Sequence, residues 1–198
     1  MKSLLSILLA CALAVTVFAK HEDDIDKRAP KTGEQVAVFD TDEGKIVLMF
    51  FPDKAPNHVK NFIKLANSKF FDGTRFHRTI PGFMIQGGDP NSKGDDQSKW
   101  GMGGPEWTVK AEFNDVKHVR GILSMARSSD PDSAGSQFFI MVASSPHLDH
   151  QYSAFGKVVS GMDVVDKIVG RPSEPGSGRA LQPVKVKTAR IVEWPIKS

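Results

Sequence analysis

The sequence predicts a mainly β protein, a closed antiparallel β-barrel with two α-helices capping its ends. Many short apolar or alternating segments follow one another along the chain, which is typical of strands. Tight turns separate them, and only two segments have apolar residues at helical spacing. The chain has 198 residues, of which 40% are hydrophobic and 25% are charged, so we expect one globular domain.

The expected strands begin with a hairpin. Residues 35–40 and 45–50 flank a turn at 41–44 that contains glycine. Residues 171–178, rich in proline, glycine and serine, are expected to form an exposed loop. Further strands are expected at 75–77, 84–86, 109–111, 121–126, 137–142, 155–159 and 184–192.

Two helices interrupt the strands. Pro56 suits the first turn of a helix, and apolar residues then recur at helical spacing until about Ser68, with lysines on the other side. A second helix begins at residues 161–163, carries a short apolar stripe and stops at Gly170.

The N-terminus predicts export. Lys2 precedes an apolar run at 4–18, and small residues lead to a cleavage position after Ala19, so residues 1–19 are expected to be a signal peptide. An uncleaved anchor and lipoprotein processing at Cys11 are the alternatives. Cleavage after Ala19 leaves a mature protein without cysteine, which excludes thiol chemistry.

The rest of the chain divides simply. Residues 20–34 are expected to form a flexible leader, 35–194 the folded domain and 195–198 a tail. We expect an exported protein, with the periplasm favoured over secretion. The net charge is +3 and the basic residues are scattered, so neither nucleic-acid binding nor membrane attachment after cleavage is expected.

The run from Phe76 to Asp89 carries the chemistry. It places Arg78 close to Phe83, Met84 and Gln86, on two β segments joined by a turn. A fixed charge among apolar side chains is costly unless it has a task, and this one can complete a pocket that grips a small nonpolar ring. Such a pocket can catalyse rotation about a peptide bond that precedes proline, which needs no nucleophile, metal or redox group.

This run resembles the signature of the cyclophilins, the peptidyl-prolyl cis-trans isomerases. Further segments that resemble the family follow in order at 101–104, 121–126, 135–140 and 147–158. The resemblance implies an eight-stranded antiparallel barrel with two helices. It also implies a monomer that uses no cofactor and no metal and acts on proline-containing polypeptide clients.

The resemblance also implies a set of site residues. The backbone of Ala126 and Arg127 would pair with the substrate as an added strand. Alternation along the strand places Gln137 and Phe139 on one side. The catalytic residues would be Arg78, Gln86, Phe139 and Tyr152. The substrate-binding residues would be Phe83, Met84, Gly101, Ala126, Arg127, Gln137, His147 and Leu148.

Departures from the family pattern, at 147 and 152 and at 127–128, affect ligand preference. His147 stands where the family often has tryptophan, which removes a donor to cyclosporin, so weak cyclosporin binding is expected. Tyr152 stands where histidine is common and can still donate to a substrate carbonyl. Arg127, followed by Ser128, adds a second cation, which is expected to favour acidic clients.

Each residue also has a simpler interpretation. Taken alone, Arg78 is a surface cation on an edge strand, the Phe and Met residues are core, and Gln137 caps a turn. Residues 147–150 have metal-like spacing, and 89–94 begin like a calcium loop but have lysine at a ligand position. A non-catalytic module or chaperone that holds proline-containing peptides in the same groove is the alternative function.

Overall fold

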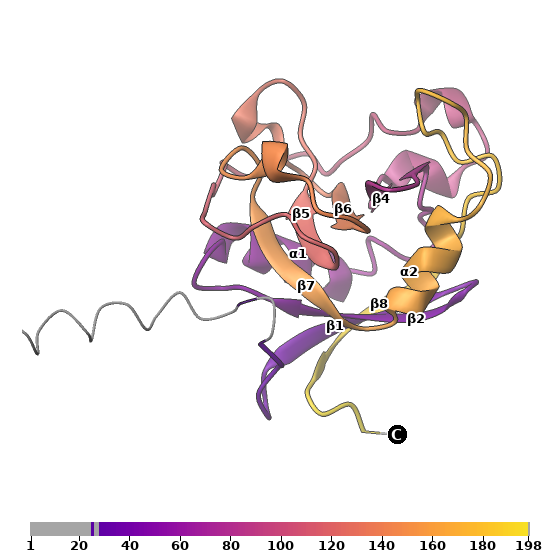
Figure 1. Cartoon of the computed structure of the whole chain (residues 1–198). Helices are drawn as coiled ribbons and strands as arrows, with labels where there is room; N and C mark the ends of the chain where they lie inside the picture. The colour runs from indigo at the N-terminus through magenta and orange to yellow at the C-terminus, as the bar shows by residue number, and fades with distance from the viewer. Residues whose placement is uncertain (1–24, 26–27, 198) are drawn as a thin grey trace, which may run out of the picture.

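The computed structural model describes residue 25 and residues 28–197 (Figure 1). The predicted signal peptide and residues 20–24, 26 and 27 of the predicted leader lie outside the described residues, so both stay predictions. No helix in the described part of the chain is long and apolar enough to cross a membrane.

Eight antiparallel strands form one curled sheet in the order β3-β4-β6-β5-β7-β2-β1-β8. Two helices, α1 (Pro56–Asn67) and α2 (Met162–Val169), pack against it, as the sequence predicts (Figure 1). The strands are β1 (Gln35–Thr41), β2 (Gly44–Phe50), β3 (Arg78–Ile80), β4 (Met84–Gly87), β5 (Ile122–Met125), β6 (Phe138–Met141), β7 (Ala154–Ser160) and β8 (Val186–Glu193).

The predicted closed barrel is not confirmed, because the sheet of the described residues is an open half-barrel with β3 and β8 at its two edges. No strand ladder joins these edges within the described residues. The segments that precede them do approach one another: Arg75 and Lys185 form an isolated bridge, and the Phe76 N–H donates to the Val184 carbonyl at 2.9 Å.

Two predicted strands are wrong. The segment 75–77 is not a strand, since β3 begins only at Arg78 and the Arg75 N–H donates to a serine hydroxyl. The segment 109–111 contributes one isolated bridge, between Val109 and Ala134. Two residues further on, the Ala111 N–H donates to the Asp132 carboxylate at 2.9 Å. Side chains therefore take the hydrogen bonds that a neighbouring strand would supply.

Side chains and glycine also define the helix ends. The Glu112 carboxylate accepts from the N–H groups of Asn57 and His58, which are free at the start of α1. Gly161, at the start of α2, has φ +93° and packs so tightly on the Lys45 carbonyl that a Cβ would collide with it.

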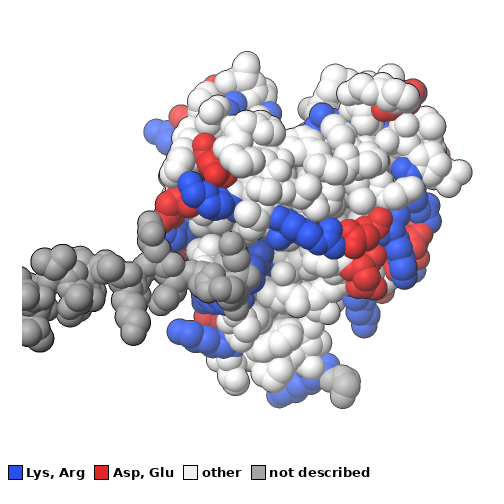
Figure 2. Space-filling view, viewed as in Figure 1, with Lys and Arg blue, Asp and Glu red and all other residues white. Residues whose placement is uncertain are grey.

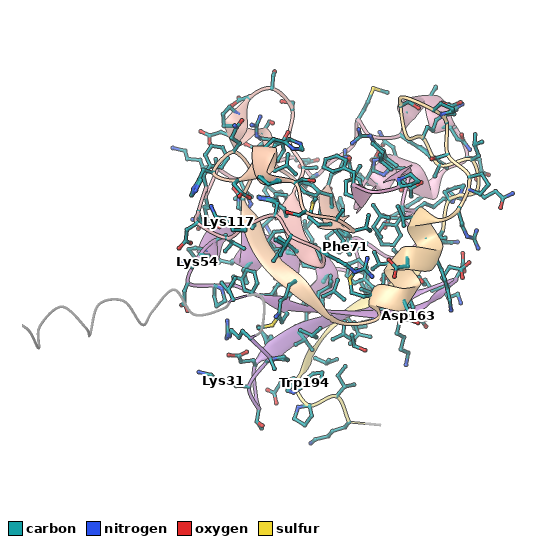
Figure 3. All side chains as sticks on the ribbon, in the orientation of Figure 1. Lys31, Lys54, Phe71, Lys117, Asp163 and Trp194 are labelled. Atoms are coloured by element: carbon teal, nitrogen blue, oxygen red, sulfur yellow. The ribbon has the colours of Figure 1, made fainter. Side chains whose placement is uncertain are left out.

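Both faces of the sheet are apolar, and each carries a packed cluster. The inner cluster lies between sheet and helices and is centred on Phe62, Phe138 and Phe71 (Figure 3). The outer cluster contains Phe139 and Met141, the residues that alternate with the inner ones along β6. The outer cluster forms the floor of the site described next.

Candidate functional site

A hollow of about 400 Å³ lies over the outer cluster. β4 and β6 run between two raised groups of loops, and the surface is notched there (Figures 1 and 2). All predicted site residues except Gly101 and Gln137 line the hollow. Its lining residues are Arg78, Phe83, Met84, Gln86, Ala126, Arg127, Phe139, His147, Leu148, Gln151 and Tyr152.

Arg78 is held at the rim of this hollow by two oxygens. It begins β3 directly opposite Gln86 of β4, and its Nη1 donates to the Gln86 Oε1 at 3.3 Å. Its Nε donates to the Ser177 carbonyl at 3.0 Å. Burial lowers the pKa of Arg78, an effect that nearby Tyr152 opposes. An arginine remains protonated under such conditions, so the site keeps a fixed cation.

Phe76, two residues before Arg78, precedes β3 and is fully buried in the inner cluster, so it does not line the hollow.

A relay of amides joins Arg78 to the glycine-rich loop at 101–104. The Gln86 Nε2 donates to the Gln137 Oε1 at 3.0 Å. The Gln137 Nε2 in turn donates to the carbonyls of Gly101 and Gly103, each at 2.9 Å. Gln137 therefore fixes the loop to Gln86 and does not cap a turn.

Asp89 also anchors this loop, a role that the sequence did not reveal. Its carboxylate is fully buried and accepts hydrogen bonds from the N–H groups of Asn91 and Gly101. Gly103 packs against that carboxylate with no room for a Cβ. Asp89, the first residue of the calcium-like segment 89–94, therefore holds the loop at 101–104 in place. No group of three or more potential metal ligands exists among the described residues.

The floor of the hollow is rigidly packed. Phe139 meets the ring of Tyr152 edge-on, with 5.7 Å between the ring centroids, and stacks on the buried His118 at 6.1 Å. His118 in turn lies between the Asp149 carboxylate, at 3.2 Å, and the Ser124 hydroxyl, at 3.0 Å. These contacts leave the Phe139 ring little freedom to leave the floor.

Arg127 has a structural role that the sequence did not predict. Its three nitrogens donate to the backbone carbonyls of Gln151, Ser128 and Ser129, and its guanidinium stacks on the Tyr152 ring at 4.6 Å. It joins two loops of the site and supports Tyr152. Because its donors are already engaged, its predicted preference for acidic clients has no support here.

A second hollow, of about 390 Å³, adjoins the first and shares Ala126 and Arg127 with it. Gly101 and Gln137 line this second hollow, which explains their absence from the first. The Ala126 N–H already donates to the Gln137 carbonyl at 2.9 Å, so a bound peptide could pair only with the Ala126 carbonyl and with Arg127.

Comparisons with known proteins agree on one family. Residues 36–191 match the family model for cyclophilin type peptidyl-prolyl cis-trans isomerase/CLD. A probable peptidyl-prolyl cis-trans isomerase of Brucella abortus (strain 2308) is 44% identical over 163 residues, covering 80% of this chain and 83% of the relative. Peptidyl-prolyl cis-trans isomerase A of Dickeya dadantii (strain 3937) is 44% identical over 162 residues, covering 77% and 82%.

Solved structures agree as well. A cyclophilin type peptidyl-prolyl cis-trans isomerase of Cryptosporidium parvum superposes with a TM-score of 0.72 at 33% identity, covering 81% of this chain and 99% of that one. A second structure of that protein, obtained in the presence of the dipeptide Ala-Pro, superposes with a TM-score of 0.71, again at 33% identity, covering 80% and 99%.

Buried histidines predict that acid lowers stability. Burial lowers the pKa of His58, His77 and His118 below the ordinary value of 6.5. As the pH falls through 6.5, the unfolded chain therefore binds protons that the folded chain does not. This contribution to stability is complete above 6.5 and is lost as the pH falls toward the folded-state values.

Urea unfolding at about pH 7.5 and about pH 5.5, above the range where carboxylates titrate, measures this loss. We expect a smaller free energy of unfolding at the lower pH. His58→Leu should reduce the difference, and the exposed His150→Asn should not. Equal stability of the unmodified protein at the two pH values would contradict the prediction.

Proposed function

This chain belongs to the cyclophilin-type peptidyl-prolyl cis-trans isomerase family, and we propose that it isomerises X-Pro bonds in the hollow beside Arg78. The activity is the one for which its relatives are named. The observation that carries the proposal is a half-buried guanidinium at the rim of a hollow whose floor is apolar.

The chemistry requires only binding and polarisation. Rotation about a peptide C–N bond costs about 18–20 kcal/mol because resonance is lost on the way. In the twisted state the prolyl nitrogen becomes pyramidal and regains a basic lone pair. A donor that meets this lone pair stabilises the transition state and not the planar ground state, which is the condition for raising the rate.

Arg78 has the geometry of such a donor. Ser177 and Gln86 engage its Nε and Nη1, while its Nη2 makes no hydrogen bond to any residue that the structure describes. The guanidinium is planar, so fixing two nitrogens also fixes the third. Nη2 can therefore donate to the prolyl nitrogen of a bound substrate without a further loss of side-chain freedom.

The hollow would hold the proline ring against Met84, Phe139 and Leu148, all buried in the outer cluster. The Ala-Pro dipeptide of the Cryptosporidium parvum structure supports a proline-containing ligand here. The flanking peptide would run along Ala126 and Arg127 as an added strand. We propose a monomeric enzyme, because every residue used in this mechanism comes from one chain.

Arg78→Ala separates catalysis from binding. We expect kcat for a short X-Pro peptide to fall about 100-fold or more, as on loss of one oxyanion-type donor, while the peptide Kd changes little. Protease-coupled isomerisation and peptide fluorescence anisotropy measure the two quantities. Arg120→Ala, which removes a surface arginine paired with Asp166, is the matched control. Unchanged turnover in Arg78→Ala would contradict the role proposed for the guanidinium, whereas peptide binding without turnover in the unmodified protein would favour the non-catalytic binding module.

His147 predicts weak inhibition by cyclosporin. It lines the hollow and packs at 5.9 Å from the Phe83 ring, without the indole donor that sensitive relatives present. Half-inhibition should require drug well above the enzyme concentration, and His147→Trp should lower that requirement. Titration of isomerase activity measures both. Complete inhibition of the unmodified enzyme at stoichiometric drug would refute the prediction.

Export is supported by the apolar run at 4–18 and the small residues before Ala19. The clients would then be exported proteins whose folding waits on X-Pro exchange. We expect cell fractionation to find the protein in the periplasm, with an N-terminus at Lys20 by sequencing. An intact Met1, or cleavage before a lipid-modified Cys11, would contradict this prediction.

A further inference from the structure

A third hollow, of about 430 Å³, lies along α1 and has no part in the mechanism above. It is lined by Lys60 and Lys64 of α1 and by Lys110, which lies in the loop before β5. None of the three forms an ion pair with an acidic side chain in the described part of the chain. The Glu112 carboxylate accepts from the N–H groups at the start of α1 and forms no ion pair with any of the three lysines.

This arrangement of charge is unfavourable without a ligand. Lys60 and Lys64 are four residues apart on one face of a helix, where like charges destabilise each other. Lys110 adds a third positive charge to the same hollow. An anionic ligand would remove this repulsion, and several carboxylates on one chain would do so better than one.

Trp107 gives the hollow an apolar wall that is already in position. Its Nε1 donates to the Asn61 Oδ1 at 2.8 Å, and Asn61 is itself fixed to the Gly135 carbonyl at 2.7 Å. The Lys64 ammonium lies 3.8 Å from the Trp107 ring centroid. The indole is nevertheless 39% exposed, so part of its face is open to a ligand.

The three hollows are contiguous. The catalytic hollow shares Ala126 and Arg127 with the middle one, and the middle one shares Trp107 and Thr108 with the basic one. Met102, 71% exposed, also lines the middle hollow. Exposed apolar side chains thus mark the path that an extended polypeptide would follow from the X-Pro bond to the lysines.

We infer that the basic hollow binds an acidic segment of the same polypeptide whose X-Pro bond occupies the catalytic hollow. This inference rests on the proposed function, since it needs the proline-containing segment to bind beside Arg78. Lys60, Lys64 and Lys110 select the client by its charge, and Trp107 packs on the apolar part of the same segment.

Binding of fluorescent peptides to the full chain tests the inference. The set comprises a short X-Pro peptide and the same peptide extended by about ten residues, enough to span about 30 Å when extended. The extension carries either glutamates or glutamines and is placed before or after the proline. The test variant is Lys60→Gln with Lys110→Gln, which leaves Lys64 stacked on Trp107. The control is Lys45→Gln with Lys167→Gln, at exposed positions outside the three hollows.

We expect the glutamate extension on one side of the proline to bind about three- to tenfold more tightly than the glutamine extension at low salt. The test variant should lose this preference, the control should keep it, and about 0.5 M salt should abolish it. The inference is overturned by no preference in the unmodified protein, or by equal effects of the test and control variants.

Isomerisation of the short peptide separates this inference from the proposed function. That peptide does not reach the lysines, so the test variant should turn it over at the normal rate. If the unmodified protein failed to isomerise it, the proposed function would fall, while the charge preference in binding would still be measured independently.

Discussion

The structure depends on one constraint: a permanent cation must be held still at the edge of a hollow that has an apolar floor. Such a charge loses hydration there and requires oxygen partners. Ser177 and Gln86 supply these oxygens. Gln86 is itself hydrogen-bonded to Gln137, which binds the loop at 101–104. Loops distant in the sequence are thereby fixed around one guanidinium, whose Nη2 is the nitrogen that meets the substrate in the proposed mechanism.

The sheet makes this arrangement rigid by packing on both faces. Phe138 belongs to the inner cluster and Phe139 to the outer one, so a single strand connects the centre of the fold to the floor of the site. A shift of Phe139 would require a shift of Phe138 among the rings of Phe62 and Phe71. Catalysis by positioning needs such a floor, because the reaction offers the enzyme no covalent step.

Local patterns predicted much of this. Alternation along 137–142 correctly separates Phe139 from Phe138, and helical spacing correctly predicts α1 and α2. The strands and helices were predictable because period is a property of neighbouring residues, which one sequence displays directly. The set of residues that lines the hollow beside Arg78 was instead expected from the resemblance to the cyclophilins, and their roles stay predictions.

The failures arise from long-range contacts. Ser177 reaches Arg78 across 99 residues, and no local pattern could single out that carbonyl in a loop predicted only to be exposed. Arg127 looked like a free cation because the carbonyls that hold it belong to another loop. The segment 109–111 has strand-like composition, yet a carboxylate binds the Ala111 amide and a hydroxyl binds the Glu112 amide, so it pairs with no strand.

Chemical rescue tests the role of the guanidinium most directly. Arg78→Ala should leave a space beside Gln86 and Ser177 that free guanidinium, at about 10–50 mM and well below denaturing levels, can occupy as a planar donor. We expect added guanidinium to restore part of kcat in this variant, methylammonium to restore much less, and neither to accelerate the unmodified enzyme. Equal recovery with both ions would contradict a specific role for the fixed, planar donor.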